Sequence, residues 1–281
     1  RYWRDWSSDV CPSDLSLADE GNVVSLSQLC RWFNMPRRTF YYQPIKKEPS
    51  VNESIATRIK QFIDKHPEAG YRTVAWMLKL NKNTVQRIFQ LKGWQVRKKP
   101  RGFRPRVKAF PSVAPQPNQR WSTDLARVWC GQDRWCTLAL VMDCCTREIL
   151  GWRLSRSAKS KTAEAALEDA LINRFGCLGR VPQTFTLRSD NGLVFCSKTY
   201  TRLVKSYGLS QEFITPYTPQ QNGMVERLIR TIKEQCVYHH RFENIRNAET
   251  IIADWIRFYN EERPHQSLGM KSPSESFKLA A

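Results

Sequence analysis

Between residues 119 and 281 the apolar and polar positions follow two different periods. Short runs rich in β-branched and aromatic residues indicate strands, whereas apolar residues that recur every three to four positions indicate amphipathic helices. Short turns at 131–133 and 146–147 separate the first three strands. The pattern predicts strands at 120–129, 134–145 and 148–155, a helix from 160 to about 175, a strand at 184–187, a helix at 198–207, a strand at 212–215, and helices from 222 to about 239 and at 248–259. We therefore expect residues 119–281 to form an α/β unit with a mixed five-stranded sheet.

The chain before this unit has a helical period only. Two short helices with a tight break at residues 34–36 are predicted between 25 and 42, which is the outline of a helix-turn-helix. Arg37 and Arg38 open the second helix and are expected to contact DNA. Residues 21–50 are therefore predicted to form a helix-turn-helix-like segment, although any small helical hairpin has this pattern. Residues 1–20 have neither period and no signal-peptide core, and they resemble translated sequencing-adapter sequence, so we expect a non-native or disordered leader.

The pattern of apolar positions in residues 51–96 predicts three further helices. The first ends near residue 67, the second opens at residue 70, and the third is expected to have Asn83 as its cap and Gly93 as its stop. Thr84, Gln86 and Arg87 face outward from the third helix, and side chains of these types read base edges and phosphates. We predict a small all-α helix-turn-helix region that binds DNA. The alternative is a polar face that is only solvated.

The charge of the chain favours DNA binding. The 281 residues carry a net charge of +19, and neutralising DNA phosphates with such charge releases counterions. Residues 97–118 are predicted to be a basic, proline-rich linker whose Lys98, Lys99 and Arg101 contact phosphates, with a solvated hinge as the alternative. The mean hydropathy is −0.55 and no apolar run is long enough to span a membrane, so we expect no membrane partner. Nine scattered cysteines without C-x-x-C spacing indicate reduced thiols rather than a zinc site.

Three carboxylates stand out in the predicted α/β unit. Asp124 lies within an apolar strand, Asp190 follows a strand and enters an Asn-Gly turn, and Glu226 lies on an amphipathic helix with 35 residues between it and Asp190. Carboxylates are hard ligands that suit Mg²⁺, and two ions roughly 3.5–4 Å apart can activate an attacking hydroxyl and stabilise a leaving oxygen at a phosphodiester. Taken singly, each acid also has a structural explanation, such as a strand-end cap or a helix ion pair. Two other acids compete for the role, but Asp143 is expected to be a turn acid and Glu212 is too close to Asp190 in the chain.

These motifs carry a family resemblance. Lys233 follows Glu226 by seven residues, and the whole pattern resembles the D,D,E signature of retroviral integrases and transposases: Trp121-Ser122-Thr123-Asp124, Ser189-Asp190-Asn191-Gly192 and Asn222-Gly223-Met224-Val225-Glu226. The chain is similar to the OrfB-type transposase of the insertion-sequence-three family from about residue 25 to 278, most strongly from 119 onward. The order of the predicted elements is that of a ribonuclease H-like core. The resemblance implies that Asp124, Asp190 and Glu226 are the catalytic residues and hold two Mg²⁺ ions, with Mn²⁺ as a substitute. Four neighbours are expected DNA contacts: Asn191, Asn222, Arg230 and Lys233.

The resemblance implies a bacterial DNA transposase that acts in the cytoplasm on the nucleoid. Such an enzyme cleaves at transposon ends and joins the freed 3′-hydroxyl to other DNA. Its implied partners are double-stranded DNA, as terminal inverted repeats and as target, further copies of the chain in a homo-oligomer on DNA, and an OrfA-type polypeptide from an upstream frame. Two alternatives are a DNA-binding regulator or decayed, inactive copy, and a ribonuclease H-like nuclease without a transfer step. The helix-turn-helix segments and the basic linker weigh against the plain nuclease.

Overall fold

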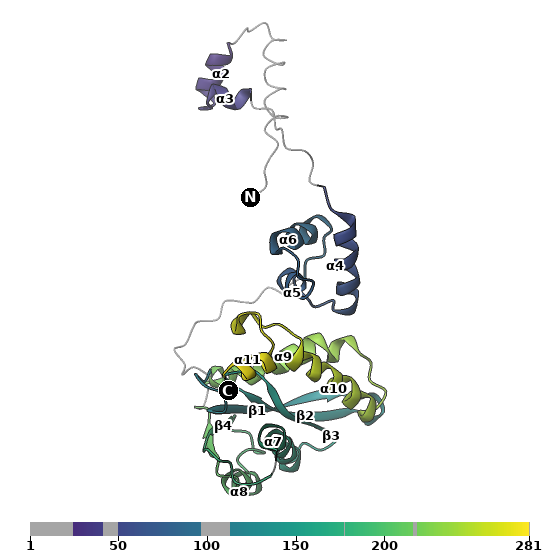
Figure 1. Ribbon diagram of the computed structural model, residues 1–281, viewed down its shortest axis with the longest axis vertical. Helices are drawn as coiled ribbons and strands as arrows, with labels where there is room; N and C mark the ends of the chain where they lie inside the picture. The colour runs from purple at the N-terminus through teal and green to yellow at the C-terminus, as the bar shows by residue number, and fades with distance from the viewer. Residues whose placement is uncertain (1–24, 42–49, 97–112, 177, 216–217, 281) are drawn as a thin grey trace. The chain divides into compact units, whose positions relative to one another are not determined.

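The computed structural model describes residues 25–41, 50–96, 113–176, 178–215 and 218–280 (Figure 1). The chain divides into two compact units between Val51 and Asn52. The described part of the first unit contains α2 (Leu26–Trp32) and α3 (Arg37–Phe40), separated by the predicted break. Ser25 and Gln28 form a capping box at the start of α2, which satisfies backbone N–H groups that the helix leaves without partners.

The second unit opens with three helices, α4 (Glu53–Lys65), α5 (Tyr71–Met77) and α6 (Lys82–Leu91). The prediction that Asn83 caps the third helix is wrong: Asn81 is the cap, and its side-chain oxygen accepts from the backbone N–H groups of Asn83 and Thr84. The reason is a short turn after α5. Lys79 takes a left-handed conformation, and Leu80 already bonds back to the Ala75 carbonyl, so the next helix starts at once.

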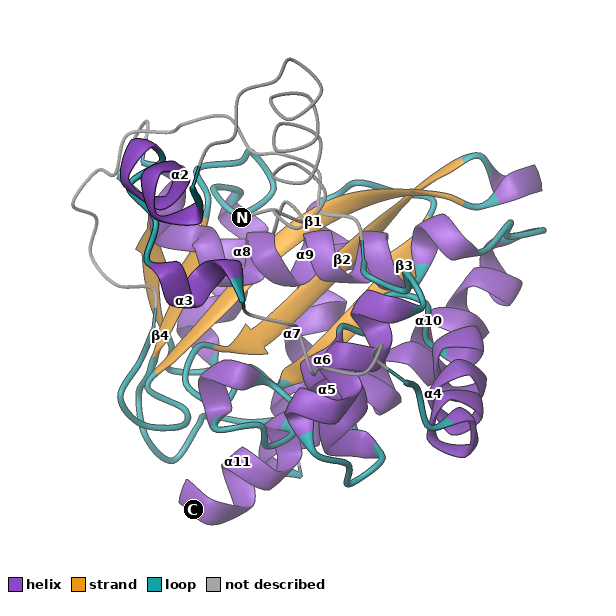
Figure 2. Ribbon diagram, turned by 90° about the horizontal axis from the view of Figure 1, so that it is seen from above, coloured by secondary structure: helices purple, strands orange, loops and turns teal. Residues whose placement is uncertain are grey.

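The rest of the second unit is built on a mixed five-stranded sheet, shown in orange in Figure 2. The strand order is β3-β2-β1-β4-β5, and the strands are β1 (Arg120–Trp129), β2 (Trp135–Asp143), β3 (Ile149–Ser155), β4 (Thr186–Ser189) and β5 (Ser210–Phe213). The first three strands pair antiparallel through short turns, including the 3-10 turn η1 (Gly131–Asp133). β4 lies parallel to β1 and to β5, and parallel neighbours need longer crossovers. The helices α7 (Ser160–Phe175) and α8 (Lys198–Ser206) form these crossovers.

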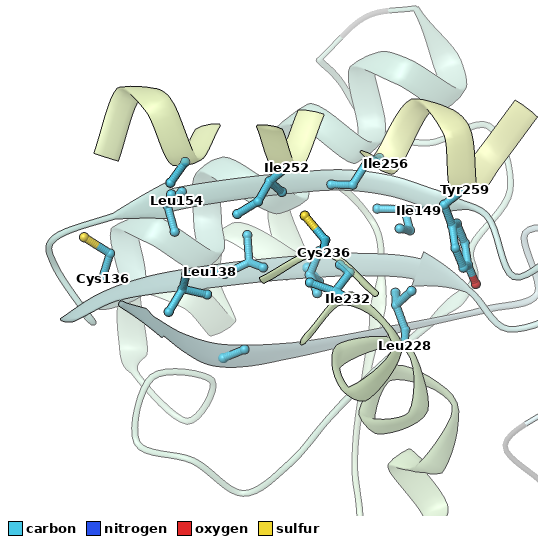
Figure 3. Packing of buried hydrophobic residues seen from close by; sticks show 14 of the residues in the cluster. Cys136, Leu138, Ile149, Leu154, Leu228, Ile232, Cys236, Ile252, Ile256 and Tyr259 are labelled. Carbon is cyan, nitrogen blue, oxygen red and sulfur yellow. The ribbon is translucent and has the colours of Figure 1, made fainter. Parts of the chain in front are cut away.

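Helices cover both faces of the sheet. Figure 1 shows α7 and α8 on one side and α9 (Gly223–Gln235) and α10 (Ile245–Glu261) on the other. Successive residues of a strand point to opposite faces, so β2 supplies both layers. Leu138 and Leu140 pack toward α9 and α10, whereas Ala139 and Val141 pack toward α7. Figure 3 shows the first of these cores, which the strands form with helices α9 and α10.

Helix α7 approaches β3 unusually closely. A Cβ atom placed on Gly151 would meet the backbone of Ala166 and would lie 2.5 Å from the Ala170 nitrogen. The buried side of α7 is made largely of alanine and leucine, which leaves room for this contact. Gly151 is therefore a packing residue that sets the distance between the helix and the sheet.

Several element boundaries differ from the sequence prediction. The bounds of β1 and α7 agree with it. The strand predicted at 184–187 ends later, at Ser189, and the strand predicted at 212–215 begins earlier, at Ser210. The long helix predicted from 222 stops at Gln235 and is followed by the 3-10 turn η3 (Val237–His239). The described residues also form elements that were not predicted, namely η2 (Pro219–Asn222), η4 (Gln266–Leu268) and α11 (Pro273–Ala280). None of the described helices has the length and apolar content needed to cross a lipid bilayer.

Candidate active site

Strand register brings Asp124 and Asp190 together. In the parallel β1–β4 pair Ser122 lies opposite Arg188, and each aspartate lies two residues further along its own strand direction. Neighbouring strands are about 4.8 Å apart. Asp190 comes immediately after the end of β4, so it lies beside the middle of β1.

Glu226 comes to the same face of the sheet from a helix. Residues Ala126 and Val128 of β1 point toward the core under α9 and α10, and Asp124 shares their side of the strand by alternation. Glu226 lies in the first turn of α9, which covers this face, and its side chain is exposed. The fold thus gathers the three acids from a strand, a strand end and a helix.

The acids influence one another electrostatically. Burial raises the pKa of Asp124 to about 7; the Leu125 N–H group opposes the shift, Asp190 and Glu226 add to it, and Lys233 lowers it. Burial also raises the pKa of Glu226, where Arg230 opposes the shift and Asp190 adds to it. Asp190 thus raises the pKa of both other acids, and the nearby cations Lys233 and Arg230 offset only part of the combined shift.

The turn after β4 fixes the direction of Asp190. Its Oδ1 atom accepts a hydrogen bond of 2.9 Å from the Gly192 N–H group, and the Asn191 side chain donates to the Ile214 carbonyl at 2.9 Å. A Cβ atom on Gly192 would lie 2.8 Å from the same Oδ1 atom. A side chain at this position would therefore push the Asp190 carboxylate out of the place that the Gly192 N–H group gives it.

The segment before Glu226 is tied to β1. The buried Asn222 side chain donates from Nδ2 to the Thr123 carbonyl at 3.3 Å, one residue before Asp124. Gln221 accepts from the Thr215 N–H group at 2.7 Å and donates to the Thr215 hydroxyl at 3.1 Å. These bonds hold η2, and with it the start of α9, against β1 and against the segment that follows β5.

A buried arginine completes this attachment and was not predicted from the sequence. Arg188 of β4 is only 3% exposed, and its Nη1 atom donates to the Gln221 carbonyl at 2.8 Å. Its other nitrogens bind both oxygens of Glu212, at 3.0 Å and 3.1 Å, and Arg120 adds a third bond to that carboxylate. Burial opposes ionisation of Glu212, but the bonds and charges of the two arginines lower its pKa below the usual value. An arginine within a short strand normally indicates a surface position, which is why sequence reasoning missed it.

The other predicted site residues are dispersed. Arg230 and Lys233 lie on α9 one and two turns beyond Glu226. Asn191 is exposed and Asn222 is buried, and their DNA contacts stay predictions. Of the helical residues, Arg37, Arg38, Thr84 and Arg87 are exposed and Gln86 is half-buried. Lys98, Lys99 and Arg101 lie outside the described residues.

The carboxylate set suits a hard divalent cation. Asp124 and Asp190 each engage one oxygen with a nearby backbone N–H group, at 2.7 Å from Leu125 and 2.9 Å from Gly192, and each keeps a second oxygen that can serve as a ligand. Oxygen-only ligands of this kind are those that Mg²⁺ prefers. Among the described residues, no three His, Cys, Asp or Glu side chains are close enough together to hold one ion between them.

Comparisons with known proteins identify the class. Residues 114–219 match one family model described as an integrase core domain, and residues 207–273 match a second model with the same description. A mixed five-stranded sheet with helices on both faces, carrying two aspartates and a glutamate on one face, is therefore an integrase core. The chain belongs to the integrase-core transposases.

Its relatives come from bacterial insertion elements. The chain is 26% identical to the InsD transposase of insertion element IS2 from Escherichia coli, an alignment that covers 98% of this chain and 96% of the relative. It is also 26% identical to an uncharacterised 39.2 kDa protein of insertion element IS476 from Xanthomonas euvesicatoria, over 91% of this chain and 73% of that protein. Among solved structures, a simian T-cell lymphotropic virus intasome matches with a TM-score of 0.50 and 14% identity, over 79% of this chain and 74% of that one, which is a likeness of fold.

Proposed function

We propose that the protein is a DNA transposase that cleaves DNA at the ends of a mobile element and joins the freed 3′-hydroxyl to other DNA. In this proposal Asp124, Asp190 and Glu226 are the catalytic residues and hold two Mg²⁺ ions, with Mn²⁺ as a substitute. The observation that carries the proposal is the convergence of these three acids on one face of the sheet, where two of them raise the pKa of the third. Kinship with the InsD transposase supports it.

The reaction assigned to the site requires correctly positioned reacting groups and stabilisation of the developing charge, and it needs no covalent bond between the protein and the DNA. When bound, two divalent ions lower the pKa of the attacking hydroxyl and stabilise the leaving oxygen. The protein's own part is to hold the ligands at fixed places, through the Gly192 turn on one side and the Asn222 attachment on the other. We propose that Arg230 and Lys233, which lie on successive turns of the Glu226 helix, bind the phosphates that flank the reacting one.

The proposed partners follow from charge and kinship. A net charge of +19 favours double-stranded DNA, which we propose to be the terminal inverted repeats of an element and its target. The proposed DNA contacts of the N-terminal part are the basic linker and five helical residues: Arg37, Arg38, Thr84, Gln86 and Arg87. A homo-oligomer on DNA and an OrfA-type partner polypeptide belong to the same proposal, as does action on the bacterial nucleoid.

A strand-transfer assay tests the function. The full chain, alone and with the upstream-frame polypeptide, is incubated with labelled pre-cleaved element ends, target DNA and Mg²⁺, and joined products are counted. We expect Asp190→Asn to reduce joining by about 10³-fold or more, because a metal ligand is lost, while DNA binding measured by anisotropy stays within about twofold.

Glu234→Gln is the matched control for this assay. It removes an exposed acid from α9, the helix that carries Glu226, and should leave joining intact. Joining that survives Asp190→Asn would overturn the site assignment. A parent protein that binds ends but never joins them would instead support the DNA-binding regulator or decayed copy.

A further inference from the structure

A groove of about 670 Å³ lies beside the candidate active site. The end of the β1–β2 hairpin forms one wall, and the segment from the end of α9 through η3 forms the other. The described residues that matter for its chemistry are Arg127, Trp129, Trp135, Lys233, Tyr238 and Arg241. Its volume is in the range of ligand pockets, which span roughly 300–1,000 Å³.

The groove combines exposed aromatic rings with positive charge. Trp129, Trp135 and Tyr238 are 50%, 54% and 72% exposed, although rings of this size are usually largely buried. The two tryptophan rings are cross-strand neighbours with centroids 5.4 Å apart at an angle of 77°. None of the described side chains that line the groove is acidic, and Arg127, Lys233 and Arg241 supply cations.

Hydrogen bonds from backbone N–H groups hold the two walls of the groove together. The Gln132 N–H group donates to the Glu243 carbonyl at 2.9 Å, and the Ile245 N–H group donates to Asp133 Oδ2 at 2.7 Å. Gly131 lies so close to the backbone of Phe242 and Glu243 that any Cβ atom would collide with it. The hairpin tip is therefore fixed against the segment after η3 before any ligand arrives, which lowers the entropic cost of binding.

The groove continues the candidate active site along two elements. Lys233 lines the groove and stands seven residues after Glu226 on α9, which is a distance of about 10 Å along the helix axis. Arg127 lines it from β1, three residues after Asp124. A strand with a phosphate at the carboxylates would thus meet the groove within a few nucleotides.

The chemistry of the groove favours an unpaired base over a duplex. In a duplex the base faces stack on one another, so a protein ring can reach a base face only when the base has left the stack. Exposed aromatic rings beside cations are the combination that binds single-stranded nucleic acid. A duplex alone would use the cations and leave the three rings without a role.

We propose that this groove binds an unpaired nucleotide of the DNA strand that is held at the carboxylates, with its base stacked on Trp129 or Trp135 and its phosphate facing Lys233 and Arg127. The inference rests on the proposed transposase function. It assigns these side chains a role in holding DNA ends whose last bases are single-stranded.

Binding to two labelled DNA fragments tests the proposal. The full chain is titrated by fluorescence anisotropy, without divalent metal so that no cleavage can occur, against a blunt duplex and against the same duplex with a three-nucleotide single-stranded extension. We expect the parent to prefer the extended fragment by about tenfold, as one stacked base provides. Trp135→Ala should abolish this preference, and Trp135→Phe should restore most of it.

Two controls separate the groove from other causes. Trp76→Ala removes an equally exposed tryptophan from α5, outside the groove, and should leave the preference unchanged. Asp190→Asn should also keep the preference, so the groove can be correct even where the strand-transfer assay fails. Equal binding of the two fragments by the parent, or a preference that survives Trp135→Ala together with Trp129→Ala, would overturn the proposal. A change of oligomeric state in Trp135→Ala with the preference intact would assign the groove to a protein partner instead.

Discussion

Three acids of one sheet show how surroundings decide the role of a carboxyl group. Asp143 is fully buried and accepts backbone N–H bonds from Asn118, Cys145 and Thr146, so it is a structural turn acid, as expected. Glu212 is neutralised by two arginines. Asp124 is half-buried, yet its nearest charged neighbours include two further acids, and it is the one whose pKa rises to about 7. A carboxylate whose burial and acidic neighbours outweigh the nearby positive charge is the kind that a metal ion stabilises.

His265 gives a residue-scale prediction that does not involve the candidate site. Burial lowers its pKa to about 3, and the nearby Arg263 and Arg147 lower it further; the ring packs edge-on against Tyr259 at 4.8 Å. The unfolded chain therefore takes up a proton near pH 6.5 that the folded chain refuses until about pH 3. The contribution of neutral His265 is complete above pH 6.5 and is lost as the pH falls, by about 1.4 kcal/mol per pH unit.

We expect His265→Gln to make the free energy of unfolding less dependent on pH under acidic conditions. Between pH 7 and pH 5 the free energy of unfolding, measured by urea denaturation, should fall by about 2 kcal/mol less in the variant than in the parent. His239→Gln, which replaces an exposed histidine, should follow the parent. An equal loss of stability in parent and His265→Gln would contradict the assignment of a neutral buried imidazole.

At the scale of elements, the site depends on how α9 is attached to the sheet. The sequence made Asp190 and Glu226 candidate site residues through their spacing and family resemblance, and it predicted β1 and α7 with their observed bounds. It misplaced the ends of β4 and β5. The bounds of these short parallel strands are set by pairing with neighbouring strands, and four residues are too few to show a hydrophobic period. The attachment by Arg188 was invisible for a related reason: its partners are 24 and 33 residues away.

Asn222 tests whether this attachment positions the proposed catalytic residues. Asn222→Ala removes the bond to the Thr123 carbonyl. We expect the strand-transfer rate to fall by about 10- to 100-fold, because Glu226 loses its fixed distance from Asp124. The affinity for blunt duplex should stay within about twofold.

Asn173→Ala is the matched control, since it removes a similar amide-to-carbonyl bond, 2.8 Å to Leu150, on the other face of the sheet. It should leave the rate unchanged. The sequence prediction that Asn222 contacts DNA leads to the opposite pattern for Asn222→Ala, namely weaker binding with an unchanged rate at saturating DNA. Measuring the rate and the affinity separately therefore discriminates between the two roles.

The contact between α7 and β3 gives a second prediction at this scale. Gly151→Ala places a methyl group against the backbone of Ala166 and Ala170, neither of which can move without shifting the helix. We expect a loss of about 1–3 kcal/mol or more in the free energy of unfolding. Gly223→Ala is the control, because Gly223 has helical backbone angles and open space around it, and it should be neutral or slightly stabilising. Similar effects of the two substitutions would show that the close approach is not a packing constraint.

At the scale of the whole molecule, the pattern of hydrophobic positions was enough to predict the fold, but it did not reveal the proposed DNA-binding groove. The alternating strands and the spaced acids define the integrase core, whose five-stranded sheet the structure confirms. The groove could not be predicted from the sequence. Trp129 and Lys233 are 104 residues apart in the chain, and only the hairpin turn and the end of α9 bring them to one cavity.

The excess of positive charge leads to the last prediction, on the salt dependence of DNA binding. If phosphate contacts supply most of the affinity, the logarithm of the binding constant should fall linearly with the logarithm of salt concentration, by about 0.9 for each phosphate neutralised. Six to ten contacts would weaken blunt-duplex binding by about 10³- to 10⁵-fold between 50 and 200 mM salt. Lys233→Gln should reduce the slope by about 1, whereas Lys278→Gln, an exposed lysine on α11, should not change it. The slope is a property of the whole chain, because every phosphate contact adds to it whichever element supplies the cation. A nearly flat salt dependence would mean that the net charge of +19 is spread over surfaces that do not meet DNA, and the assignment of Lys233 to the DNA path would fall with it.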